Sequence, residues 1–222
     1  MRKCLVILFC LVGLATSQAA NALTFNLTSD HCTSSTGASG GGCGGSGTLF
    51  GFVTVVQNLA NVDLTVHLNS PYVFAKTGSA DDQAFKFNAT GILVTDITVD
   101  PHTPLLTADA GAFNGDGTGN FGFGIICLLC GPGTSNAFTT DIVFHVANAS
   151  VADLTTPNNL GNVFVADIGA PCGGASQPAC AGSSGFNTGP ADAVVPDGGS
   201  TVTLLGSVLL GLGMLRRRFG KS

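Results

Sequence analysis

The segment from residue 114 to residue 120 has the spacing of a cation-binding loop. Oxygen-bearing side chains alternate with glycines there, at Asn114, Asp116, Thr118 and Asn120. Oxygens at alternate positions can wrap a hard cation such as Ca²⁺. The EF-hand pattern fails, because its twelfth position needs a bidentate acid and is Ile125 here. A β-turn is the favoured interpretation and the cation site the alternative, since Gly, Asn and Asp tolerate positive φ. We therefore expect no cofactor, with calcium as the alternative.

No catalytic set emerges from the other reactive residues. Residues 37–41 match Gly-x-Ser-x-Gly, but no apolar strand precedes them and no helix follows, as a nucleophile elbow requires. Asp81 and Asp82 are adjacent in a polar loop, whereas the two carboxyl groups of a glycosidase must converge across the substrate. The four histidines are scattered along the chain. We therefore expect no enzyme, with a secreted hydrolase as the last alternative.

The cysteines of the body indicate disulfides. They number six, an even count that is typical of exported proteins: Cys32, Cys43, Cys127, Cys130, Cys172 and Cys180. Proximity in sequence favours pairing them in that order, each pair in or beside a Gly-rich loop. A redox Cys-x-x-Cys at residues 127–130 would need a helix N-terminus, which the surrounding sequence does not favour. Zinc is a further alternative, with His31 and His145 available, although no ligand spacing points to it.

The composition of residues 23–195 narrows the partners. This body carries twelve Asp and two Lys, a formal charge of −10, whereas the whole chain has −5. Such a charge repels phosphates, so we expect no nucleic-acid partner. The chain has no Trp, and Tyr72 is its single Tyr. Sugar-binding faces favour these rings, so a glycan-binding role is weakened but stays open.

Short β-strands separated by Gly-rich turns dominate the body. Residues 62–68 alternate between apolar and polar, which predicts a half-buried strand, and 141–147 are nearly all apolar, which predicts a fully buried one. The expected strands are 23–28, 49–57, 62–68, 84–89, 93–99, 120–127, 141–147 and 162–167. This pattern favours an all-β fold, a jelly-roll-like β-sandwich.

Both ends of the chain have export features. Residues 1–22 have the basic start, apolar centre and small-residue cleavage site of a signal peptide, with cleavage favoured after Ala22 over Ala19. An uncleaved anchor is the alternative. At the other end, the apolar run 202–215 covers about 21 Å as a helix, short of a hydrocarbon core about 30 Å thick. Basic residues after it stay cytoplasmic, which places the body outside. A buried terminal helix is the alternative for this run.

The C-terminal end resembles the PEP-CTERM class of sorting signals, and its Val-Pro-Asp-Ser-Gly variant in particular. The turn motif consists of Val195, Pro196, Asp197, Gly198, Gly199 and Ser200, and the basic stop of Arg216, Arg217 and Arg218. Gly198-Gly199 stand where the variant has Ser-Gly. The resemblance implies a Gram-negative protein that an exosortase cuts near the motif. It also implies passage from an inner-membrane anchor to the surface or the exterior, in association with exopolysaccharide and biofilm.

The expected organisation has four parts. A signal peptide occupies 1–22, a β-sandwich domain 23–189, a linker and sorting motif 190–200, and a transmembrane helix with its basic tail 201–222. The expected function is a structural or adhesive role in the envelope or biofilm. The alternative is a calcium- or glycan-binding module.

Overall fold

A computed structural model describes residues 22–33, 37, 41–45, 47–77, 82–175, 177–181 and 185–195. The expected signal helix and everything from Pro196 onward, including the expected transmembrane helix, lie outside these residues. The helices within the described ranges, η1 (Val94–Asp96) and α2 (Val151–Leu154), are too short to cross a membrane.

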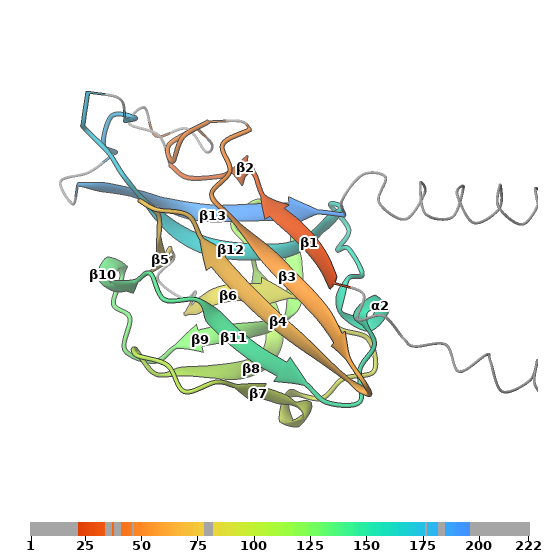
Figure 1. Ribbon diagram of the computed structural model, residues 1–222. Helices are drawn as coiled ribbons and strands as arrows, with labels where there is room; N and C mark the ends of the chain where they lie inside the picture. The colour runs from red at the N-terminus through yellow and green to blue at the C-terminus, as the bar shows by residue number, and fades with distance from the viewer. Residues whose placement is uncertain are drawn as a thin grey trace, which may run out of the picture.

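Five antiparallel strands form one layer, which we call sheet A (Figure 1). Their order is β1 (Ala22–Leu27), β3 (Gly51–Asn58), β4 (Asn61–Leu68), β11 (Ile142–Val146) and β7 (Ile97–Val99). Strand β4 follows the predicted alternation: its apolar residues are buried and its polar residues are partly exposed. Strand β11 alternates in the same way, so the prediction of a fully buried strand is wrong. Val143 and His145 occupy its outer face.

The second layer, sheet B, is built around β12 (Asn162–Pro171). Strand β13 (Phe186–Val194) pairs along the length of β12 and carries β2 (Ser29–Asp30) on its far side. Strands β5 (Val73–Lys76) and β6 (Gln83–Phe87) therefore share the other edge of β12. Strand β10 (Gly133–Phe138) pairs with β5, and β9 (Asn120–Cys127) and β8 (Leu106–Asn114) extend the sheet beyond β6.

Aromatic side chains join the two sheets. Phe144 of sheet A packs against Phe85 and Phe87 of sheet B, with ring centroids 6.0 and 5.3 Å apart. Phe25 of β1 meets Phe164 of β12 edge to face at 5.0 Å, an arrangement that aromatic quadrupoles favour. The predicted all-β, two-layered fold is confirmed. Its jelly-roll-like refinement stays a prediction.

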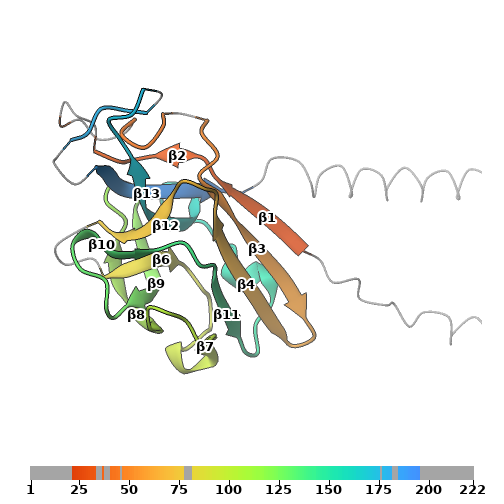
Figure 2. The ribbon, with the colours of Figure 1, turned by 60° about the vertical axis from the view of Figure 1, so that its left-hand side comes forward.

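One side of the sandwich is closed by a strand that changes sheets. The chain leaves β1 in sheet A, passes Thr28, and enters β2 in sheet B (Figure 2). Such switches form the corners of β-sandwiches. The backbones approach closely at this corner, since a Cβ added to Gly189 of β13 would lie 2.4 Å from Cys32 Cα. Only glycine fits there.

Strand β13 extends the described strands as far as Val194. Residues 186–194 were expected as a Gly-rich loop and linker, yet they pair with β12 and β2 and are largely buried. The misassignment came from Gly189 and Pro190, which usually interrupt strands. Pro190 cannot donate to the ladder, but its carbonyl still accepts from the N–H of His31 at 3.1 Å, so β13 keeps this bond to the chain beside it. The expected strand at 93–99 is also shorter, because η1 occupies its first half.

Candidate functional site

The predicted cation loop forms the tip of the β8–β9 hairpin. Asn114 Oδ1 accepts the backbone N–H of Asp116 at 3.0 Å, and Thr118 Oγ1 donates to the Gly115 carbonyl at 2.6 Å. Asn120 pairs with Asn114 where the strands meet, and Asp116 is exposed with a φ of 45°. Two of the four predicted ligand side chains thus form turn bonds. A calcium site here stays a prediction.

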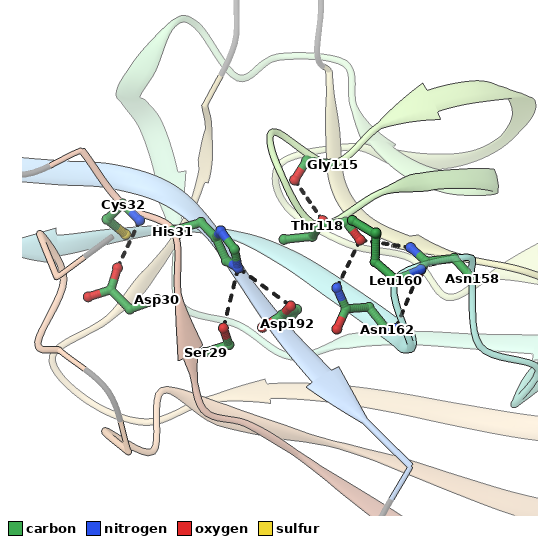
Figure 3. A network of polar contacts seen from close by, with 10 residues as sticks. All are labelled: Ser29, Asp30, His31, Cys32, Gly115, Thr118, Asn158, Leu160, Asn162 and Asp192. Atoms are coloured by element: carbon green, nitrogen blue, oxygen red, sulfur yellow. Dashed lines mark hydrogen bonds and ion pairs between the residues drawn. The ribbon is translucent and has the colours of Figure 1, made fainter. Parts of the chain in front are cut away.

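The hairpin tip is fastened to the start of β12. The Thr118 carbonyl accepts from Asn158 Nδ2 at 2.7 Å and from Asn162 Nδ2 at 2.8 Å (Figure 3). Thr118 is fully buried and Asn162 nearly so. These bonds hold the tip over the outer face of sheet B.

A serine, a histidine and an aspartate meet beside this tip. His31 Nε2 lies 3.3 Å from Ser29 Oγ and 3.6 Å from the nearer carboxylate oxygen of Asp192 (Figure 3). A Ser-His-Asp triad places its hydroxyl and its carboxylate on opposite ring nitrogens. Here both oxygens approach Nε2, so the geometry does not support a proton relay. Asp192 is 4% exposed, and its Oδ1 has no hydrogen-bond partner in the described part of the chain.

A fully buried ion pair crosses from β6 to β12. Lys86 Nζ lies 2.9 Å from Asp167 Oδ1, and neither side chain is exposed. Thr77 Oγ1 donates to Asp167 Oδ2 at 2.6 Å and lies 3.5 Å from the exposed Asp116. A buried pair is stable only when its geometry is good and further hydrogen bonds satisfy it. Thr77 supplies one such bond.

Histidine–aspartate pairs occupy the outer face of sheet A. His145 on β11 contacts Asp63 Oδ1 through Nδ1 at 2.7 Å and Asp100 Oδ1 through Nε2 at 3.0 Å. The hydrogen bond to Asp63, helped by Asp100, raises the pKa of His145 despite some desolvation. Partial burial would raise the pKa of Asp63, but its bonds to His145 and Asn58 outweigh that effect and lower it.

The three predicted disulfides are present: Cys32–Cys43, Cys127–Cys130 and Cys172–Cys180. Asp30 organises the first ring, because its carboxylate accepts the backbone N–H groups of Cys32, Cys43, Gly44 and Gly45 at 2.8–3.0 Å. The sulfurs of Cys32 and Cys43 are bonded to each other and offer no thiolate to a metal. Cys127 ends strand β9, so this cysteine pair does not have the helical setting of a redox motif.

The C-terminal region carries a recognised sorting signal. Residues 194–219 match the family model described as the VPDSG-CTERM motif. The chain therefore has a PEP-CTERM-like C-terminal sorting signal, which indicates an exported, cell-surface protein with an exosortase-type processing enzyme as partner. No curated protein and no solved structure matches the chain. The match begins at Val194, the last residue of β13, so the signal follows the folded body directly.

The polar residues on sheet B were missed at the sequence level. A signal existed for Lys86, one of two lysines in the body, which stands between Phe85 and Phe87 in an apolar strand. Asp167 similarly interrupts the apolar run of β12. Charges at such positions are buried with a partner when both faces of a sheet are covered. Asp192 had no comparable signal, because its segment was interpreted as a linker.

Proposed function

We propose that the body is a non-catalytic structural or adhesive module of the envelope or biofilm matrix of a Gram-negative bacterium. An exosortase-type enzyme would process it at the inner membrane and release it to the surface or to an exopolysaccharide matrix. The observation that carries this proposal is the way the sorting signal joins the fold. Strand β13, which precedes the signal, pairs with β12 on one edge and with β2 on the other.

This connection suits a protein that bears load. Hydrogen bonds of an antiparallel ladder lie perpendicular to the strands. A force applied to the segment that follows Val194 acts along β13. The hydrogen bonds to β12 from Asn162 to Pro171 therefore share the load. A terminal strand held on one short edge would instead peel away bond by bond. The ladder therefore supports a structural or adhesive role.

The described surface gives little support to catalysis. The groove between β7 and β8 is open and is lined by eight side chains, none of them titratable: Val94, Thr95, Ile97, Thr98, Val99, Leu106, Thr107 and Ala108. The Ser29–His31–Asp192 cluster lacks relay geometry, as shown above. A secreted hydrolase therefore ranks below the structural role.

Surface attachment tests the structural proposal in a host that carries an exosortase. Cells making the full chain should attach to a surface more firmly than cells making a chain that ends at Val194. The shortened protein should be lost to the medium. Replacing Arg216, Arg217 and Arg218 by Ala is the matched control, since it leaves the folded body and the turn motif intact. We expect added protein to restore attachment in proportion to its dose, whereas restoration by trace amounts would indicate an enzyme. Equal attachment with and without surface-bound protein would refute the proposal.

A calcium-binding role is a second proposal. It rests on the oxygens of Asp116, Thr77 and Asp167, which three separate segments bring near one another. Excess Ca²⁺ should raise the melting temperature of the wild type but not that of Asp116→Asn. An unchanged wild-type melting temperature would exclude tight calcium binding. A glycan role has no aromatic platform among the described residues to support it.

A further inference from the structure

We propose that His31, Asp192 and Ser29 form a binding site for a divalent transition metal, with Zn²⁺ as the ion that suits the ligands best. The site lies on the outer face of sheet B, beside the hairpin tip (Figure 3). It is distinct from the predicted calcium loop, because none of the loop's four candidate ligand residues belongs to it.

The β-ladder places the three side chains on one face. Ser29 and His31 are two residues apart in an extended segment, so their side chains point the same way. Asp192 is the register partner of Ser29 in the antiparallel pair of β2 and β13, and register partners share a face. Backbone bonds fix this register, since Thr28 N donates to Asp192 O at 3.2 Å and His31 N to Pro190 O at 3.1 Å.

The distances fit coordination better than hydrogen bonding. Nε2 lies 3.3 Å from Ser29 Oγ and 3.6 Å from the Asp192 carboxylate, both longer than good hydrogen bonds. Zinc binds nitrogen and oxygen ligands at about 2.0–2.2 Å, which places neighbouring ligand atoms of a tetrahedron about 3.3–3.6 Å apart. Both oxygens therefore lie about one tetrahedral edge from Nε2, the spacing expected of ligands that share an ion.

The state of Asp192 independently points to a cation. Its side chain is 5% exposed, and Oδ1 has no hydrogen-bond partner among the described residues. A buried carboxylate oxygen without a hydrogen-bond partner is unfavourable, whereas one that binds a metal is satisfied. His31 is 29% exposed, so the site has access to solvent and to a water molecule as fourth ligand.

The ligand types select the ion. Calcium and magnesium take oxygen ligands, whereas an imidazole nitrogen with a carboxylate suits zinc and similar transition metals. A neutral imidazole is required, so the metal and a proton compete for Nε2.

The test uses protein purified in its oxidised form from cells making the full chain, stripped with a chelator and dialysed. Zinc at ten times its Kd should raise the melting temperature by about 3–6 °C. Cobalt(II) should give the strong visible absorption of a tetrahedral site, a signal that a purely structural ion pair cannot produce. His31→Gln and Asp192→Asn should abolish both effects, and Ser29→Ala should weaken them.

The matched control variants are His67→Gln and His145→Gln, because each of these histidines also contacts aspartate but lies on sheet A. Both should keep the wild-type response. Asp192→Asn keeps the shape of the side chain and removes its buried charge, so it should fold and thereby separate lost binding from lost structure. A wild type that responds to neither metal would overturn the proposal. So would a response that survives His31→Gln and disappears with a sheet A variant.

Discussion

The outer faces of the two sheets differ in how far their polar side chains are exposed to solvent. On sheet A, the side chains of His67, Asp141 and His145 are each about two-fifths exposed and pair at the surface. On sheet B, Lys86 and Asp167 pair with no exposure at all, and every residue of β12 except Pro171 is buried. One sheet therefore has a single buried face, whereas the central strands of the other are buried on both.

The difference arises from what lies over each sheet. Thr118 holds the β8–β9 tip on the start of β12, and Gln83 and Phe113 lie over Gly124, where a Cβ would come 2.3 Å from Gln83 Cγ and 3.4 Å from the Phe113 ring. These segments keep water from the polar groups of sheet B, whereas the polar groups on the outer face of sheet A stay hydrated. The loss of the same type of bond should then lower the free energy of unfolding far more on sheet B, because a polar group without a hydrogen-bond partner is costly only when it is buried.

Breaking the buried pair should have the largest effect. Lys86→Met leaves Asp167 buried without its cation and should lower the free energy of unfolding by about 3–5 kcal/mol. The double variant Lys86→Met/Asp167→Leu should recover most of that loss, since it removes both charges of this pair. Asp141→Asn is the matched change on sheet A, where breaking the pair with His67 should lower it by no more than about 1 kcal/mol. Denaturant unfolding of oxidised protein measures all three, and similar losses on both sheets would contradict the comparison.

Hydrogen bonds from asparagine side chains should show a smaller difference between the two sheets, again with the larger loss of stability on sheet B. Asn162→Ala removes one of the two donors to the Thr118 carbonyl in a buried setting, and should lower the free energy of unfolding by about 1–2 kcal/mol. Asn58→Ala removes the exposed bond from Asn58 Nδ2 to Asp63 Oδ2 on sheet A, and should change it by less than about 0.5 kcal/mol. Hydrogen exchange at the hairpin tip should accelerate only in Asn162→Ala. Equal acceleration in both variants would mean that Asn162 does not hold the tip.

The same contrast explains which parts of the fold the sequence could predict. Strand β4 alternates because one face is exposed to solvent, and its predicted buried residues, Val62, Leu64, Val66 and Leu68, are the observed ones. Strand β13 has both faces covered and contains Gly189 and Pro190, so neither alternation nor an apolar run marked it. Its place depends on β12 and β2, which are distant in sequence. The disulfides were predictable because each joins cysteines close in sequence, whereas the meeting of His31 with Asp192 depends on the pairing of β2 with β13.

The pH dependence of the His145 cluster should be the smallest effect, and it belongs to sheet A alone. The pKa of His145 is raised above its ordinary 6.5, so its contribution to stability is complete below pH 6.5 and disappears as the pH rises through the folded-state value. The pKa of Asp63 is lowered from 3.8, so its contribution is present above pH 3.8 and disappears as the pH falls through the folded-state value. The stability difference between wild type and His145→Gln should therefore be greatest between about pH 4 and 6.5. His145 is 42% exposed, so solvent screening should keep the difference below about 1 kcal/mol, and added salt should reduce it further.

Thermal unfolding across this range measures the difference, with Asp63→Asn/His145→Gln as the control that should lack this dependence. A difference that grows above pH 7 would contradict the assignment, because an imidazolium between two carboxylates can only lose its advantage as it deprotonates.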